Sequence, residues 1–592
     1  MIRLACRLLL PGLVAATAGA AAAASTAPSP GAPDGAAATR ADGDPPAAVA
    51  TFTAAAEIEL ERALEMRLPD QPAPYLVSFE LLDGNVATAE ASFGALVNTS
   101  AGPYRQVRTE VRVGDYHLDN GNFEGDFGSD SGVRSRLLPH DPVLLAFRRE
   151  LWLSADESYK GAAQQLSDKL AARQGVHREY TDDLYRVDPL VTPPLRPAAV
   201  DEAALDAMVQ ALSATLRGHG FEEGTAIARD WQGVRTLVSN EGHRASIPTG
   251  FTVVRVEAVA RAEDGARLRD IRSFVATSPG GLPSLEEMQA EVEEMAAWLE
   301  GLRDAPVEDD YLGPVLFQGQ AAMELFRQLL APEMSGTPQP ERPAIGFETP
   351  DAVPTARLGR RLLPEGWRVV DDPLAAQAAD LPGGYLHDFE GVPARAVTVV
   401  EDGVTRDLLM SRVPREGFDG SNGHGRSLGN DRRVAVPASV TVDAARTRSM
   451  ARLERKGLAL ARDTVQPYLL VIGQLTPPAL DEDFRIAFSG DAPLPGLTAP
   501  LEAWRLYPDG TTEPVRGLEF VGVDRRALRD IVLAGRRNPP MGVMDAPPGP
   551  QRSSIGPIGG LPASWAVPDV LISELELHGG GGREPRILPP PP

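Results

Sequence analysis

Glu324 is the residue of this sequence best placed to do chemistry. It lies in an apolar stretch with helical spacing at residues 318–336 (QGQAAMELFRQLLAPEMSG), which follows a strand-like run at residues 311–317 (YLGPVLF). Strand-to-helix junctions carry catalytic groups in several enzyme classes. A glutamate at such a junction can act as a general base toward a metal-bound water. Glu324 is therefore either a catalytic carboxylate or an ordinary helical residue.

The residues around Glu324 also fit a purely structural role. Three apolar side chains recur at helical spacing and predict a stripe that faces the core: Met323, Phe326 and Leu330. Glu324 would then lie on the solvent side of the helix and pair with Arg327 or Gln328. This structural interpretation is the favoured one.

The other patterns that could carry chemistry are incomplete. The loop FDGSNGHGR has Asp419 where the first glycine of a serine-hydrolase G-x-S-x-G elbow should stand. In the acid- and glycine-rich run from Asp119 to Gly132, a calcium loop of the EF-hand type that starts at Asn120 would have Ser131 at its twelfth position, where glutamate is needed, so a solvated turn is favoured. No two histidines have the spacing with which one helix holds zinc.

The charge balance excludes some partners. The chain has 592 residues and a formal net charge of −24. A nucleic-acid partner is not expected, because a phosphate backbone requires a basic protein face. No lysine stands in a G-x-x-x-x-G-K-[ST] loop, which excludes a P-loop nucleotide site.

The N-terminus predicts export. Arg3 and Arg7 precede an apolar, alanine-rich segment, and residues 1–25 have the pattern of a cleaved signal peptide. The mature protein is expected to be periplasmic or extracellular and to have no membrane anchor. Cys6 is the only cysteine of the chain, so cleavage would remove the possibility of a disulfide, a cysteine nucleophile or a thiolate-bound metal.

Periodicity and turn residues predict an α+β fold. A helix is expected within residues 52–68 and further helices at 157–175, 200–218 and 284–303. Strands are expected at 251–261 and 268–276, and turns at four dipeptides: Asp83-Gly84, Gly102-Pro103, Asp402-Gly403 and Asp509-Gly510.

The predicted organisation has five segments. An N-terminal mixed α/β domain would precede a strand-rich C-terminal domain, either barrel-like or a sandwich. The boundaries are a signal peptide at 1–25, a disordered Ala/Pro/Gly-rich linker at 26–50, the N-terminal domain at 51–305, the C-terminal domain at 306–578 and a flexible tail at 579–592.

Several ordered segments of the second half resemble the C-terminal region of the TldD/PmbA family. The clearest is residues 384–417, GYLHDFEGVPARAVTVVEDGVTRDLLMSRVPREG, which is similar to the family's glycine–loop–Asp-x-Glu-Gly segment and the hairpin after it. RVAVPASVTVD resembles the family's strand before its central helix, and EAWRLYPDGTTEPVRGLEFVGVDRRALRDIVLAG resembles its later hairpin and closing helix. The segment SIGPIGGLPASWAVPDVLISELELHG is similar to its last loop and strand. The resemblance implies metallopeptidases or their non-catalytic partners.

The resemblance also implies where zinc ligands would stand. Active members carry H-E-x-x-x-H on a helix that follows a strand, plus a cysteine in the C-terminal loop. Matching by that context keeps Glu324 but places Met323 and Gln328 at the two histidine positions, and residues 555–560 (IGPIGG) contain no cysteine. A thioether and a neutral amide are poor zinc donors. No metal and no other cofactor are therefore expected.

Two functions follow from the resemblance. The first is a non-catalytic pseudoenzyme that binds an extended peptide by strand addition, or forms a homo- or heterodimer with a TldD-like subunit. Its peptide cavity would be lined by His387, Asp388, Glu390 and Arg426. The alternative is an active zinc metallopeptidase whose site is rearranged around Glu324, with His387, Asp388 or His424 as further ligands. A metal-independent hydrolase ranks last, because no elbow or triad is present.

Overall fold

The computed structural model describes residues 39–40, 45–124, 132–174, 182–341, 356–428, 432–478, 496–545 and 559–580. The predicted signal peptide (1–25) and residues 581–592 of the predicted tail lie outside the described residues. Within the described ranges, no helix is both long enough and apolar enough to span a membrane.

The first helix begins inside the segment predicted to be a disordered linker. Helix α1 spans Ala47–Leu64, so that prediction is wrong for residues 47–50. Val49 is buried and shares an apolar cluster with Phe52. Burial of this kind orders an alanine-rich segment whose intrinsic helix propensity is already high. Ahead of the helix, β1 (Thr39–Arg40) pairs with β5 (Leu195–Arg196).

An antiparallel sheet is the framework of the N-terminal part. Its strand order is β4-β3-β2-β6-β8-β9, with β7 beside β6. The predicted strands at 251–261 and 268–276 correspond to β8 and β9. The strands are β2 (Pro74–Ser92), β3 (Ala95–Val113), β4 (Val133–Leu137), β6 (Glu223–Ser239), β7 (Arg244–Pro248), β8 (Phe251–Arg261) and β9 (Arg267–Ala276).

Two predicted turns in this sheet are wrong. Strand β2 runs without interruption through Asp83-Gly84, and β3 runs through Gly102-Pro103. The chain turns instead at Phe93 and Gly94, whose φ angles of 47° and 79° suit a tight hairpin. Gly84 has a packing role, because a Cβ there would lie 2.7 Å from the Trp231 ring on the neighbouring strand.

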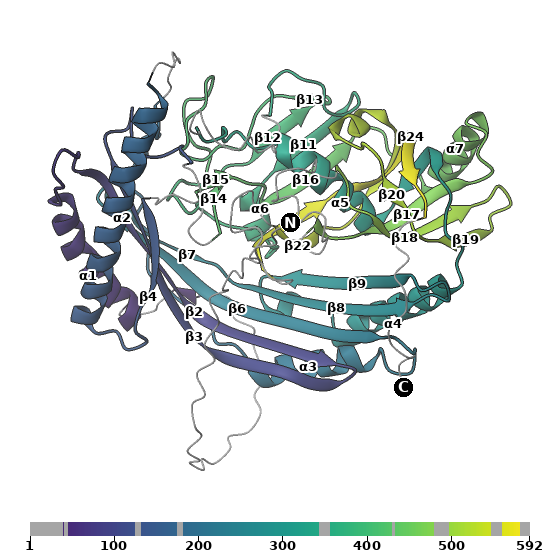
Figure 1. Ribbon diagram of the computed structural model, residues 1–592, viewed down its shortest axis with the longest axis horizontal. Coiled ribbons are helices and arrows are strands. Elements are labelled where there is room, and N and C mark those ends of the chain that lie inside the picture. Colours follow the sequence, from purple (N-terminus) through teal and green to yellow (C-terminus); the bar gives the residue numbers. More distant parts are fainter. Residues whose placement is uncertain are drawn as a thin grey trace, which may run out of the picture. The chain divides into compact units, whose positions relative to one another are not determined.

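Helices α1 to α4 cover one face of this sheet. On β2, the odd-numbered residues 77–81 belong to the apolar cluster with α1 and α2, and the odd-numbered residues 87–91 to the cluster with α3 and α4. The two helix pairs therefore cover successive parts of the same face (Figure 1). The bounds are α2 (Leu144–Ala172), α3 (Glu202–Ala214) and α4 (Leu285–Arg303), with a short 3₁₀ helix η2 (Pro279–Gly281).

Two further sheets form the C-terminal part. One has the order β19-β18-β17-β10-β24-β20, with β21 beside β24. Its strands are β10 (Tyr311–Phe317), β17 (Leu469–Leu475), β18 (Pro500–Leu506), β19 (Thr512–Val515), β20 (Glu519–Phe520), β21 (Ile531–Arg537) and β24 (Pro568–His578).

The other sheet has the order β13-β12-β11-β16-β23-β22, and a separate small pair, β14-β15, lies outside it. The strands are β11 (Trp367–Asp371), β12 (Val397–Glu401), β13 (Val404–Thr405), β14 (Gly425–Arg426), β15 (Val434–Ala435), β16 (Ser439–Ala444), β22 (Met541–Asp545) and β23 (Leu561–Ala566). The turn predicted at Asp402-Gly403 is confirmed between β12 and β13, and the turn at Asp509-Gly510 between β18 and β19.

The two C-terminal sheets share one apolar core. Helix α5 (Gly319–Leu330) lies in it, and its Phe326 belongs to the same buried cluster as Ile572 of one sheet and Val399 of the other. The remaining helices are α6 (Pro373–Ala378), α7 (Met450–Asp463), η3 (Ala331–Glu333) and η6 (Arg525–Asp530). The expected family closing helix corresponds to the short 3₁₀ helix η6. The α+β class is confirmed; the C-terminal sheets are sandwich-like, and the described strands form no closed barrel.

Candidate functional site

Glu324 lies at the centre of a buried ion-pair network on α5. The Arg327 guanidinium donates to both carboxylate oxygens of Glu324, with Nη2 2.9 Å from Oε1 and Nε 3.0 Å from Oε2. The Gln328 amide donates to the same carboxylate at 3.0 Å. The Arg327 Nη1 atom also donates to Asp545 at 2.6 Å, so one guanidinium joins two carboxylates.

The predicted pairing of Glu324 is confirmed, but its predicted exposure is wrong. Glu324 is only 2% exposed, although its partners are Arg327 and Gln328 as the helical spacing indicated. The strand β22, which carries Asp545, places an acid opposite the polar side of α5. A glutamate on that side can therefore be buried, because the ion pair compensates the loss of hydration.

The residues present on α5 do not fit a zinc ion. Met323 is 3% exposed and belongs to the apolar core with Phe326 and Leu330, as predicted. The Gln328 amide nitrogen donates hydrogen bonds to the Glu324 carboxylate at 3.0 Å and to the Thr498 hydroxyl oxygen at 2.9 Å. Zinc prefers imidazole, thiolate or carboxylate donors, and here the one carboxylate is neutralised by a guanidinium. Residues 555–558 of the loop without cysteine lie outside the described residues.

The four residues predicted to line a peptide cavity come close together in the chain's interior. His387, Asp388 and Glu390 precede β12, Arg426 lies in β14, and each is 6% exposed or less. Both carboxylates accept backbone N–H groups: Asp388 from Gly425 at 2.8 Å, and Glu390 from Arg412 at 2.7 Å. Their place in a peptide cavity remains a prediction.

Asp388 and Glu390 form a buried carboxyl pair. Burial and the neighbouring Glu390 together raise the pKa of Asp388 to about 7. Burial also raises the pKa of Glu390, although Arg412 and Arg433 oppose the shift. A Cβ at Gly425 would lie 2.1 Å from Glu390 Oε2 and 3.1 Å from Asp388 Oδ2. Only glycine therefore fits beside this pair.

Arg426 and the two histidines have mainly structural contacts. Arg426 donates to the carbonyls of Pro437 and Pro562, and its guanidinium lies 5.2 Å from the centre of the Tyr385 ring. His387 bonds to the backbone carbonyl of Asp388, and His424 to Asn422. None of these contacts reaches Glu324. The ranges that the structure describes contain no group of three metal-ligating side chains, so no observation favours a rearranged metal site.

A small charged cavity lies where the N-terminal sheet meets the loops of the C-terminal part. Its volume is about 20 Å³, room for one water molecule. Of the predicted lining residues, Glu390 contributes to its wall. The other charged or titratable lining residues are Glu110, Arg112, Glu241, His243, Arg412 and Arg433. A cavity of this size cannot hold a peptide.

Ion pairs across this cavity join the two parts of the chain. Arg412 donates to both oxygens of Glu241 at 2.7 Å, and Arg433 and Arg235 both bond to Glu80 of β2. Burial lowers the pKa of His243 to about 4, so that imidazole is neutral at neutral pH. The cluster is a buried set of paired charges, a type that strongly penalises loss of one partner.

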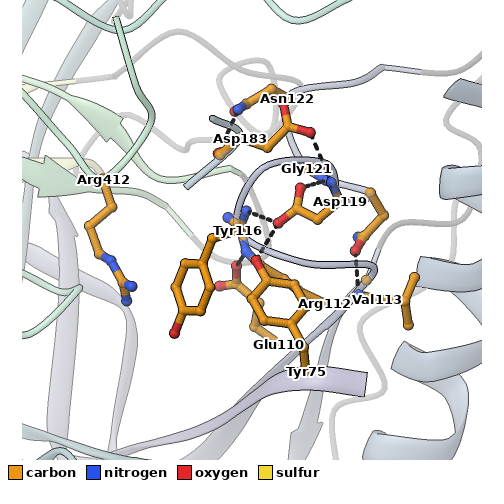
Figure 2. A network of polar contacts seen from close by, with 12 residues as sticks. Tyr75, Glu110, Arg112, Val113, Tyr116, Asp119, Gly121, Asn122, Asp183 and Arg412 are labelled. Carbon is orange, nitrogen blue, oxygen red and sulfur yellow. Dashed lines mark hydrogen bonds and ion pairs between the residues drawn. The ribbon is translucent and has the colours of Figure 1, made fainter. Parts of the chain in front are cut away.

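Figure 2 shows how this network continues along β3. Arg112 donates to Glu110 and to Asp119, both at 2.9 Å, and the Tyr75 hydroxyl donates to Asp119 at 2.6 Å. Burial alone would raise the pKa of Glu110, but Arg112 and Arg108 hold it below its usual range. Asp119 is fully buried, so the solvated turn predicted for 119–132 is wrong at its first residue; residues 125–131 lie outside the described ranges.

Sequence reasoning missed this network. One local signal was available, because Arg108, Glu110 and Arg112 alternate on β3 and must share one face of the strand. Three alternating charges on a strand otherwise indicate a solvated face. Their partner Glu80 lies on another strand, β2, and their partner Asp119 lies in the loop after β3. The sequence pattern does not indicate either pairing.

The comparisons with known proteins agree on one fold. Residues 311–461 match the family model described as the PmbA/TldA metallopeptidase C-terminal domain. That region contains α5, the carboxyl pair and most of α7. No curated protein matches the chain.

Three solved structures are similar over most of the chain. A putative modulator of a DNA gyrase from Thermotoga maritima shares 14% identity, with a TM-score of 0.54 over 85% of this chain and 96% of its own. TldE from Thermococcus kodakarensis shares 12% identity, with a TM-score of 0.55 over 89% and 100%. A putative modulator of DNA gyrase from Bacteroides thetaiotaomicron shares 11% identity, with a TM-score of 0.55 over 89% and 98%. At such identities the likeness concerns the fold.

Proposed function

The chain belongs to the TldD/PmbA family, and from that premise we propose that it is an exported, non-catalytic member. In this proposal it binds an extended peptide or pairs with a TldD-like subunit. One observation carries the proposal: Arg327 and Gln328 occupy the Glu324 carboxylate on the helix where the family resemblance expects zinc ligands.

The chemistry of α5 supports the absence of peptidase activity. Peptide hydrolysis by this family requires a metal-activated water and a general base beside it. The Glu324 carboxylate accepts three hydrogen bonds from Arg327 and one from Gln328. A base held in this way has few lone pairs left for a water, and its negative charge is compensated.

Strand addition has a suitable edge in β3. Residues 106–110 of β3 pair with β4, whereas residues 95–105 pair with β2 on one side and with no described strand on the other. Leu96 and Val97 on this stretch are 39% and 60% exposed. Over residues 95–104, this open strand edge offers main-chain hydrogen bonds to an extended peptide or to a strand of a partner subunit.

The fold relatives support a partner role. The chain covers all of TldE from Thermococcus kodakarensis in the structural comparison, and the family resemblance includes members without zinc ligands that pair with catalytic ones. We therefore place this chain on the non-catalytic side of such a pair. Its predicted signal peptide would deliver it outside the cytoplasm.

The direct test is metal analysis followed by co-expression with a TldD-like chain that carries H-E-x-x-x-H. The purified chain alone should contain no stoichiometric zinc and should not hydrolyse peptides in zinc-supplemented buffer. It should co-purify with the catalytic chain. Stoichiometric zinc, or hydrolysis that disappears in Glu324→Gln, would overturn the non-catalytic assignment.

A matched pair of variants tests the β3 edge. Val97→Lys places a charge on the free edge and should weaken co-purification. Val143→Lys adds the same charge at a residue 54% exposed outside that edge and should leave it unchanged. Equal behaviour of the two variants would refute pairing through β3.

A further inference from the structure

A groove of about 450 Å³ lies between α4 and β9 on one side and β18 and β19 on the other. Its volume is within the range of sites that hold small ligands or a few side chains, about 300–1,000 Å³. None of the residues considered above as catalytic or cavity-lining belongs to it. Its lining residues are Arg272, Glu294, Trp298, Glu502, Trp504, Thr512 and Pro514.

Two tryptophans form the aromatic part of the groove. The rings of Trp298 and Trp504 are 5.9 Å apart and inclined by 70°. A Cβ at Gly473 would lie 2.9 Å from the Trp504 ring, so glycine leaves space for that indole. The Trp298 Nε1–H group is buried and donates to no described residue.

The groove is acidic. Glu294 lies one helical turn before Trp298, and Glu287 and Glu291 continue the same side of α4. Burial raises the pKa of Glu291, and Glu294 and Glu287 raise it further while Arg272 opposes them. The groove lining itself has two glutamates, Glu294 and Glu502, and one arginine, Arg272, so its formal charge is negative.

The one cation of the groove is already compensated. Arg272 donates to Glu502 at 2.5 Å and to Asp270 at 3.1 Å, and it also bonds to Gln474. The positive charge of Arg272 is therefore neutralised by Glu502 and Asp270. A ligand entering the groove meets two indole rings and the Glu294 carboxylate, a combination that favours a positive charge.

We propose that this groove binds a lysine or arginine side chain of an extended peptide. The cationic head would lie against the indole rings and near Glu294. The inference rests on the peptide-binding part of the proposed function and adds a preference for basic residues.

Isothermal titration calorimetry with end-blocked peptides tests the preference. Three short alanine peptides are compared, carrying lysine, glutamate or glutamine at the same positions. The lysine peptide should bind about tenfold more tightly than the glutamine peptide, with the glutamate peptide weaker still. Its affinity should decrease as ionic strength increases.

Variants assign the binding to the groove. Trp504→Leu should reduce the affinity for the lysine peptide about tenfold. Trp298→Phe should reduce it less, because a phenyl ring attracts a cation more weakly than an indole ring does. Glu294→Gln should weaken binding a few-fold. Its control is Glu293→Gln, because Glu293 lies one residue away on α4 and faces His219 at 3.9 Å. Melting curves for each variant show whether the fold is retained.

The outcomes separate this inference from the proposed function. Equal binding of the three peptides would refute the charge preference and leave peptide binding in place. Lysine-peptide binding that is unaffected by Trp504→Leu and Glu294→Gln would refute the groove as its site. No binding of any peptide would refute the inference and the peptide-binding role together, while co-purification with a TldD-like chain tests the partner role independently.

Discussion

Replacing Arg327 by methionine should destabilise the chain by about 3–5 kcal/mol, because the change leaves a buried carboxylate without its charge partner. The guanidinium donates three hydrogen bonds of 2.8–3.0 Å to Glu324 and one of 2.6 Å to Asp545. Of the bonds between Glu324 and described residues, the 3.0 Å bond from Gln328 would remain.

The size of the expected loss follows from burial. The Glu324 side chain is 3% exposed and that of Asp545 18%, so water can replace the lost partner at Asp545 more easily than at Glu324. Methionine approximates the length of the arginine stem, which keeps the packing cost small.

The assay is urea unfolding followed by circular dichroism, with the midpoint compared between variants. The control is Arg368→Met, because Arg368 pairs with Glu401 at 3.1 Å and both side chains are more than half exposed. An exposed pair of this kind contributes about 1 kcal/mol or less.

Equal midpoints for the two variants would refute the reasoning. They would show that the Glu324–Arg327 pair contributes no more than a surface ion pair, and that Glu324 could be released for another role. A double variant, Glu324→Leu with Arg327→Met, provides a further check. It should be more stable than the sum of the two single losses indicates, because no unpaired carboxylate remains on α5.

Three further predictions concern the interior charges. In the folded chain, burial and Glu390 raise the pKa of Asp388 to about 7, above the unfolded value of about 3.9. The contribution of this carboxyl to the free energy of unfolding is therefore fully present below a pH of about 4 and is lost as the pH rises through about 7. Glu390→Gln should flatten that decrease in melting temperature across pH. Gly425→Ala should cost about 1–3 kcal/mol by overpacking, because its Cβ would lie 2.1 Å from Glu390, whereas Gly420→Ala, with nothing within 4 Å, should melt like the parent chain. Arg412→Met should lower the urea midpoint by an amount corresponding to about 3–5 kcal/mol, because it removes the charge partner of the buried Glu241 carboxylate. A loss below about 1 kcal/mol would contradict the role of this buried ion pair in joining the two parts of the chain.

Much of the fold was predictable because its signals are local. The helix expected at 284–303 is α4 (Leu285–Arg303), which begins with a capping box between Ser284 and Glu287. The strand expected at 251–261 is β8, and Asp402-Gly403 forms the turn after β12. Capping residues, alternation and positive-φ turns depend on neighbours in the sequence, so one sequence is sufficient to find them.

The turns at Asp83-Gly84 and Gly102-Pro103 were predicted wrongly for a related reason. Both dipeptides have turn chemistry, but β2 is paired on both sides along this stretch, by β3 and by β6. Long-range pairing outweighs the local preference. The Asp83 side chain bonds to Arg105 at 2.8 Å across the β2–β3 ladder, which gives the aspartate a partner inside the sheet.

Residue types alone establish that histidine is missing at the two positions where the family resemblance expects zinc ligands, because Met323 and Gln328 stand there in any fold. The sequence also determined the α+β class and the acidic character of the chain. Folding brings together three sets of groups that no sequence pattern joins: the Glu324–Arg327 pair with Asp545, Asp388 with Glu390, and Trp298 with Trp504. These groups stand up to 218 residues apart in the sequence, and their contacts arise from sheet pairing and packing, which local residue patterns do not encode.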